Sequence, residues 1–221
     1  MKKTIKVLLS ILLVASMVPV LTGCGDKENS KKGEDAVEQS KDVNVQQEEK
    51  VEISMGKWNG NVYTNDFLGL KFNLPEGWKY SSDEEIAEMM NLGADLLNDE
   101  QKASAELAKL TSVTYVAANN PNTGNNVTIM SEKLLMDLTT EYYINQLKTQ
   151  LAAVESMKYT IGGTATEKVG SLEYDTLTVS VDAYGITQKY YIRKMDNYIA
   201  CIILTSVNGE TGINEMVNCF Q

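Results

Sequence analysis

The feature that most constrains the fold is the stretch Tyr198–Val207, because it predicts a β-strand that is apolar on both faces. Side chains alternate between the two faces of a strand, so two apolar sets point in opposite directions. These sets are Ala200, Ile202 and Leu204 on one face and Ile199, Cys201 and Ile203 on the other. Such a strand must lie at the centre of a sheet that is covered on both sides.

Further strands are predicted on either side of two helical segments. Residue alternation and turn signals place them at Phe67–Leu74 with Val62–Tyr63, Ser112–Ala118, Val127–Glu132, Tyr159–Lys168, Leu172–Val181 and Ile186–Lys194. The turns between the later strands are short, which favours antiparallel pairing. Residues 119–126 are rich in Asn but contain no carboxylate, so we expect a plain hairpin loop there and not a calcium site.

Helical periodicity supplies the layers that the central strand requires. Ser82 and Glu85 form a capping box at the start of a helix whose apolar spacing continues to Leu97 and resumes from Ala103 to Leu110. A second helix is predicted from about Thr140 to Ser156. A terminal helix carries Ile213, Met216, Val217 and Phe220. The expected fold class is α+β, an antiparallel β-sheet flanked by helices on both faces in an α/β/α sandwich.

The N-terminal residues have the pattern of a bacterial lipoprotein signal peptide. Lys2, Lys3 and Lys6 precede an apolar run, Val7–Leu21, which is shorter than a membrane span. The run ends in Leu21-Thr22-Gly23-Cys24, where a cysteine thiol accepts the lipid. We therefore predict that residues 1–23 are removed, that Cys24 is the lipidation site carrying palmitate or a related acyl chain, and that the protein is anchored to the bacterial cell membrane, facing outside the cytoplasm.

Composition divides the mature chain into a tether and a domain. Residues 24–57 contain no aromatic residue and alternate acids with lysines, so we expect a disordered tether with an average span of roughly 30 Å. Residues 58–221 have the alternation and caps of a single α+β domain. The chain has 20 basic and 30 acidic residues, and removing the three lysines of the signal leaves a net charge of about −13. This charge argues against nucleic acid as a partner and makes membrane attachment covalent.

One short segment resembles a known family. Residues 67–78, FLGLKFNLPEGW, form a strand that ends in Pro-x-Gly-Trp before a helix, and this is similar to the opening of the Mog1/PsbP-like fold. The run of paired strands and the closing helix are similar too. The resemblance implies a binding or accessory module without enzymatic activity. It identifies no partner, since no binding residue of a characterised member matches this chain.

The residue inventory offers little for catalysis or metal binding. The chain contains no histidine, which excludes Ser-His-Asp and Cys-His catalysis and the usual zinc sites. Cys201 and Cys219 are either free thiols or a disulfide, and spacing does not decide between them. Ser54 and Lys57 match a Ser-x-x-Lys pattern only within the predicted tether, and the pair Glu84 and Glu85 belongs to a helix start. We expect no catalytic residues, no cofactor and no metal.

The preferred function is a lipid-anchored extracytoplasmic binding or accessory module that recognises an unknown protein or a cell-wall ligand. The alternatives are a solute-binding lipoprotein of a transporter, which needs two lobes and a hinge, and a histidine-independent hydrolase, which needs convergent carboxylates. Lys189, Tyr191 and Arg193 alternate onto one strand face as aromatic and cationic residues do at binding surfaces. The competing interpretation is that these three residues simply lie under a helix or in solvent.

Overall fold

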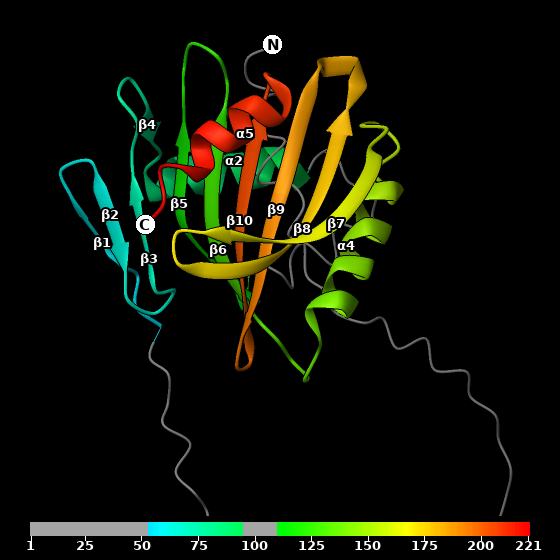
Figure 1. The fold of residues 1–221 in the computed structure, drawn as a ribbon, viewed down its shortest axis with the longest axis horizontal. Helices are drawn as coiled ribbons and strands as arrows, with labels where there is room; N and C mark the ends of the chain where they lie inside the picture. The colour runs from blue at the N-terminus through cyan, green and yellow to red at the C-terminus, as the bar shows by residue number, and fades with distance from the viewer. Residues whose placement is uncertain (1–52, 95–109) are drawn as a thin grey trace, which may run out of the picture.

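The computed structural model describes residues 53–94 and 110–221, and a seven-stranded antiparallel sheet forms its centre (Figure 1). The strand order is β4-β5-β6-β10-β9-β8-β7. The strands are β4 Lys79–Tyr80, β5 Ser112–Asn119, β6 Asn126–Lys133, β7 Thr160–Val169, β8 Leu172–Val181, β9 Ile186–Met195 and β10 Tyr198–Ser206. A smaller sheet has the order β1-β2-β3, with β1 Lys57–Asn59, β2 Val62–Asn65 and β3 Leu70–Asn73.

The central strand is the one that the sequence predicts. β10 pairs along its length with β6 on one side and β9 on the other, and all nine of its residues are buried. Ile202 is 1% exposed and Ile203 is fully buried, although their side chains point to opposite faces. The prediction of a central strand that is covered on both sides is therefore confirmed.

One face of the sheet packs against α4, Thr140–Ala153, and we call this packing the α4-side core. Its members include Ile199, Cys201 and Ile203 from β10. The helix contributes Tyr143, Ile144, Leu147 and Leu151, which recur at helical spacing and are all buried. The hydroxyl of Tyr143 donates to Oε2 of buried Glu132 at 2.9 Å, so a polar contact joins α4 to β6 within this apolar layer.

The opposite face packs against α5, Gly209–Val217, and against the small sheet, forming the α5-side core. Ile213 and Met216 of α5 lie in one cluster with Ala200, Ile202 and Leu204 of β10. Leu70 and Phe72 of β3 belong to the same cluster. An antiparallel sheet with few helices is thus confirmed, but the cover on this face differs from the all-helical layer that we expected. A second sheet shares it with α5, because β1–β3 have an apolar face of their own to bury.

The terminal helix is shorter than its apolar pattern predicts. It ends at Val217, and Phe220 lies beyond it, where it forms an isolated antiparallel bridge with Phe72 of β3. The two rings are 5.0 Å apart between centroids. The last residues of the chain therefore extend the small sheet, since the main chain of Gln221 also exchanges two hydrogen bonds with Lys71.

The helix start at Ser82 is confirmed in its details. The helix α2 spans Asp83–Ala94. The main-chain N–H of Glu85 donates to Oγ of Ser82 at 3.3 Å, and the N–H of Ser82 donates to Oε2 of Glu85 at 2.8 Å. This reciprocal pair is the predicted capping box. The predicted continuation of the helical pattern, residues 95–109, lies outside the described residues.

The start of the domain differs slightly from the predicted boundary at residue 58. Lys57, the last residue of the predicted tether, is the first residue of β1. Met55 and Ser54 are tied to β2 through their carbonyl oxygens, which accept hydrogen bonds from the Tyr63 hydroxyl at 2.8 Å and from Asn65 Nδ2 at 3.0 Å. Cys24 and residues 25–52 of the predicted tether lie outside the described residues.

We predict that Ile202→Asp and Ile203→Asp each lower the free energy of unfolding by more than about 3 kcal/mol, since each buries an unpaired charge on one face of β10. Urea unfolding followed by circular dichroism measures the loss. Thr149→Asp, at an exposed position of α4, is the matched control and should change little. Tolerance of either isoleucine replacement would contradict the burial of the corresponding face.

Because several tyrosines are buried, we predict that the free energy of unfolding decreases at alkaline pH. Burial, together with nearby Glu132, raises the pKa of Tyr143 well above 10, and burial does the same for the pKa of Tyr190. In the unfolded chain both hydroxyls ionise near pH 10, whereas in the folded protein they stay protonated to higher pH. Their contribution to the free energy of unfolding is therefore fully present below pH 10 and decreases above it. We expect a loss of about 1.4 kcal/mol per pH unit for each tyrosine. Urea unfolding at pH 9 to 11 tests this, and Tyr143→Phe should flatten the dependence.

Candidate functional site

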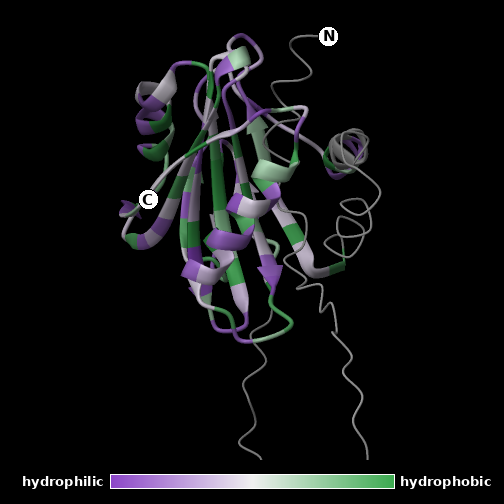
Figure 2. Cartoon of the chain, turned by 90° about the vertical axis from the view of Figure 1, so that its right-hand side faces the viewer, coloured by the Kyte–Doolittle hydropathy of each residue, from purple (hydrophilic) through white to green (hydrophobic). Residues whose placement is uncertain are grey.

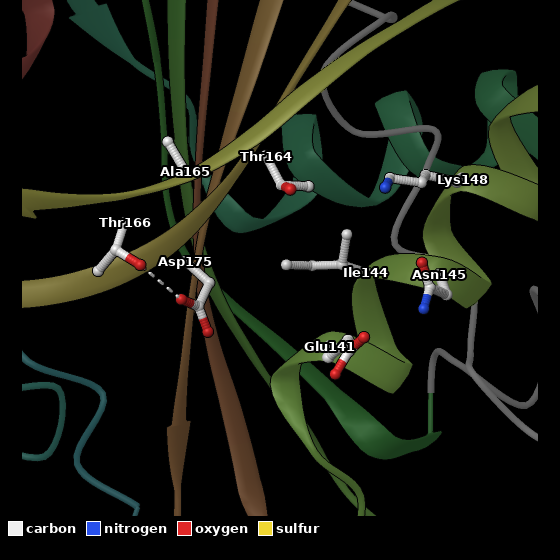
Figure 3. A pocket seen from close by; sticks show the side chains of 8 residues that line it. All are labelled: Glu141, Ile144, Asn145, Lys148, Thr164, Ala165, Thr166 and Asp175. Atoms are coloured by element: carbon white, nitrogen blue, oxygen red, sulfur yellow. Dashed lines mark hydrogen bonds between the residues drawn. The ribbon is translucent and has the colours of Figure 1, made fainter.

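The candidate site is a cleft of about 430 Å³ between α4 and the strands β7 and β8 (Figure 3). The residues that line it are Glu141, Ile144, Asn145, Lys148, Thr164, Ala165, Thr166 and Asp175. Most of them are polar and at least partly exposed. The cleft is therefore a place where another molecule can reach both a helix and a sheet edge.

The helical wall comes from the first three turns of α4. Glu141, Ile144, Asn145 and Lys148 follow one another at spacings of three, one and three residues, which places them on one side of the helix. Ile144 is 5% exposed, and its side chain extends from α4 toward β7 and Asp175 (Figure 3). The arrangement is an apolar floor with an acid, an amide and an ammonium group around it.

The back of the cleft is held by a carboxylate with two partners. Oδ2 of Asp175 accepts a hydrogen bond from Thr140 Oγ1 at 2.5 Å, and Oδ1 accepts one from Thr166 Oγ1 at 3.2 Å. These contacts join the first residue of α4 to β8 and β8 to β7. Because both carboxylate oxygens already accept hydrogen bonds, Asp175 fixes the two walls relative to each other.

The strand wall is an edge of the large sheet. Within the described residues β7 pairs with β8 and is the last strand in the order. Alternate residues of an antiparallel strand turn their main-chain N–H and C=O groups away from its partner, so those groups of β7 face outward. A register shift lies between Ile161 and Thr164, and at Gly162 a β-carbon would lie 2.6 Å from the Thr178 carbonyl oxygen. Glycine is required there for β7 to approach β8 this closely.

The cleft presents hydroxyl, amide, carboxylate and ammonium groups. Its hydroxyl groups are those of Thr164 and Thr166, and no histidine exists anywhere in the chain to activate them. Among residues 53–94 and 110–221, no group of three or more His, Cys, Asp or Glu is placed to hold a metal ion. In the same ranges no helix is long and apolar enough to cross a membrane.

Lys189, Tyr191 and Arg193 do not form a binding surface. The ammonium of Lys189 lies 2.7 Å from Oε1 of Glu167, and the Tyr191 hydroxyl donates to Oε2 of the same glutamate at 3.3 Å. Arg193 Nη2 donates to the Leu68 carbonyl oxygen at 2.6 Å. Lys189 and Tyr191 are buried, so the competing interpretation is closer to the structure.

This row of residues is internal because β7 bends over it. Val169, at the end of β7, and Leu172, at the start of β8, both belong to the α5-side core. The turn between them reaches the end of the chain, since a β-carbon on Gly170 would lie 2.6 Å from the Gln221 carbonyl carbon. The alternation of cations and aromatics therefore predicted the strand correctly, but the β7–β8 hairpin buries the face on which these residues lie.

The two cysteines of the domain are free thiols. Cys201 is buried in the α4-side core, whereas Cys219 packs against the α5-side core on the other face of the sheet. Burial raises the pKa of both thiols, and Glu132 raises that of Cys201 further. Both groups therefore remain protonated at neutral pH and are poor nucleophiles.

The other sequence patterns that suggested chemistry have structural roles. Oγ of Ser54 accepts a hydrogen bond from the Gly56 N–H at 3.3 Å, and Lys57 lies in β1. The Asn-rich loop is a hairpin turn, in which Asn120 Oδ1 accepts hydrogen bonds from the N–H groups of Asn122 and Thr123. The hairpin prediction for residues 119–126 is confirmed.

The cleft itself was not predicted from the sequence. Glu141, Asn145 and Lys148 have the spacing of an ordinary solvent-facing helix surface, and nothing in their pattern indicates which strand lies opposite. The signal that could have pointed to it is Thr160–Thr166, a strand segment without a charged residue and with two adjacent glycines. Such a segment has little of the charge that usually protects a sheet edge.

Comparison with known proteins gives two similar solved structures. No family model and no curated protein matches the chain. The chain is similar to the solution structure of cyanobacterial PsbP (CyanoP) from Synechocystis sp. PCC 6803, at 12% identity and a TM-score of 0.45, covering 75% of this chain and 97% of that one. It is also similar to a crystal structure from Bacteroides thetaiotaomicron, at 13% identity and a TM-score of 0.33, covering 69% of this chain and 44% of that one. The first neighbour is a PsbP, the family that residues 67–78 resemble.

Proposed function

We propose that this chain is a lipid-anchored binding or accessory module that works outside the cytoplasmic membrane, and that the cleft between α4 and β7 is its contact site. The sequence Leu21-Thr22-Gly23-Cys24 after a short apolar run supports the anchor. The observation that carries the binding role is the open, polar cleft beside β7, which within residues 53–94 and 110–221 pairs with β8 alone. A molecule that is tethered through its N-terminal segment is well suited to present such a cleft to neighbours on the same membrane.

The ligand that best fits this cleft is an extended polypeptide segment. An extended segment can pair with the outward main-chain groups of β7, and the adjacent helix wall then contacts its alternate side chains. Thr160–Thr166 carries no charge that would block such pairing. Glu141 and Lys148 are positioned to select charged or polar side chains, and Ile144 provides a small apolar contact.

The alternatives receive less support from the described residues. A solute-binding lobe pair needs two separate cores with a hinge, whereas here both cores lie on the two faces of one sheet. A hydrolase needs a carboxylate that is free to act as acid or base. Of the two carboxylates that line the cleft, Asp175 has both oxygens engaged by Thr140 and Thr166, which favours a positioning role, and Glu141 is exposed on α4.

We predict that Cys24→Ala abolishes fatty-acid incorporation and releases the protein from the membrane fraction, because the thiol is the acyl acceptor in this motif. Growth with a labelled fatty acid, followed by fractionation and mass spectrometry of the N-terminal peptide, measures both effects. Cys219→Ala, which changes a half-buried thiol in the domain, serves as the matched control and should leave labelling intact. Labelling that persisted in Cys24→Ala would contradict the anchor.

We predict that the double variant Asn145→Lys with Thr164→Lys reduces partner binding about tenfold, equivalent to ~1.4 kcal/mol. The changes place one charged side chain on the helical wall and one on the strand wall of the cleft, and charge on an edge strand opposes pairing with another strand. Both positions are exposed, so folding should be unaffected. Cross-linked pull-down from intact membranes, with an epitope tag inserted in residues 25–52, measures recovery of each partner. Thr149→Lys with Asn214→Lys makes the same chemical changes at exposed positions outside the cleft. Equal recovery with both double variants would contradict the cleft as the contact site.

A further inference from the structure

The loop between β6 and α4 exposes two large apolar side chains at its tip. Leu135 is 63% exposed and Met136 is 46% exposed, whereas Leu134 just before them is buried. In Figure 2 this loop is a hydrophobic segment at one end of the domain. We call Leu135 and Met136 the apolar tip. The two adjacent side chains form a small apolar patch at this end of the domain.

The apolar tip is held in place from both sides. The N–H of Leu134 donates to the Asn197 carbonyl oxygen at 2.7 Å, which joins the loop to the turn between β9 and β10. Asp137, just after the tip, forms an ion pair with Lys194 at the end of β9. The two contacts fix the loop ends against the sheet, so the exposed side chains project from a defined position.

The described chain enters the domain at this same end of the sheet. The carbonyl oxygen of Ser54 accepts a hydrogen bond from Asn65 Nδ2, and the Asn65 side chain accepts one from the Leu68 N–H. Arg193, near the end of β9, in turn donates to the Leu68 carbonyl oxygen at 2.6 Å. The entry point, the end of β9 and the apolar tip are therefore successive parts of one end, which Figure 1 shows at the bottom of the sheet.

The charges at this end differ from those of the whole chain. At this end Lys133 of β6 and Arg193 and Lys194 of β9 balance Asp66, Asp137 and Asp196. The whole chain has a net charge of −10. An anionic membrane surface repels an acidic body, so the neutral, apolar end is the part that can approach lipid most closely.

We propose that the apolar tip inserts into the interface of the membrane that carries the Cys24 anchor. This inference rests on the lipid anchoring put forward above. The occupant is lipid because the described chain begins at this end, at residue 53, and Cys24 lies only 29 residues before it in the sequence. A random coil of that length would span roughly 30 Å, which keeps this end within reach of the surface. Two side chains bind lipid weakly by themselves, but the covalent anchor makes their insertion an intramolecular step with a high effective concentration.

Insertion orients the domain and its cleft. Glu141 and Lys148 belong to the first three turns of α4, which begins directly after the loop that carries the tip. The cleft then opens close to the membrane surface and sideways along it. Ligand segments that lie near the same surface would reach it most readily.

The test compares tryptophan fluorescence at the two ends of the sheet in the full acylated chain. Leu135→Trp places the probe at the tip, and Tyr184→Trp places it at an exposed residue in the β8–β9 connection at the opposite end. Each protein is reconstituted in phosphatidylcholine vesicles that contain nitroxide-labelled phosphatidylcholine. Emission of the unaltered chain, which comes from Trp58 and Trp78, is subtracted from both.

We expect the added emission of Leu135→Trp to shift to shorter wavelength and to be quenched by labelled lipid, and that of Tyr184→Trp to remain unquenched. With acylation of Cys24 verified by mass, equal emission from both probes would overturn the insertion and leave the anchor intact. A blue shift at Leu135→Trp without lipid quenching would overturn it too, since protein would then cover the tip. Absence of acyl chains on Cys24 would remove both the anchor and this inference.

Discussion

The structure depends on the burial of β10 on both faces. Ile202 and Ile203 are adjacent in sequence and almost fully inaccessible in opposite directions, so two separate apolar layers must exist at the same time. The α4-side core satisfies one requirement and the α5-side core the other. The neighbouring elements meet these two requirements. β6 and β9 form the main-chain hydrogen bonds of β10, and the helices and the small sheet exclude water from its two faces.

The polar groups inside this apolar framework are paired where they join layers. Tyr143 on α4 donates to Glu132 on β6, and Lys189 on β9 pairs with Glu167 on β7. A buried charge costs several kcal/mol unless it has a partner, so these contacts restrict how the layers can pack more than they add net stability. They specify which helix and which hairpin lie over which strand.

The sequence predicted what depends on local pattern, and it did so in detail for β10 and the capping box of Ser82 and Glu85. It predicted less where the outcome depends on a distant partner. Phe220 has helical spacing but pairs with Phe72, because the small sheet offers it an apolar neighbour. Lys189 and Tyr191 alternate as surface residues do, yet a hairpin that bends across the sheet covers them. The cleft depends on the same kind of long-range placement, so no local signal specified it.

The ion pair of Lys189 with Glu167 has a consequence for the cleft. Thr166 faces the cleft, and the next residue, Glu167, turns to the other side of β7, where it binds both Lys189 and Tyr191. Moving this wall outward would take away the nearer of the two carboxylates that pair with buried Lys189 and leave only Glu210 at 3.7 Å, a change that is costly in free energy. The strand wall of the cleft is accordingly held in one position. For the proposed polypeptide ligand this means that the segment adapts its shape to the cleft, that selectivity comes from rejection of segments that do not fit, and that little binding energy is lost in reshaping the protein.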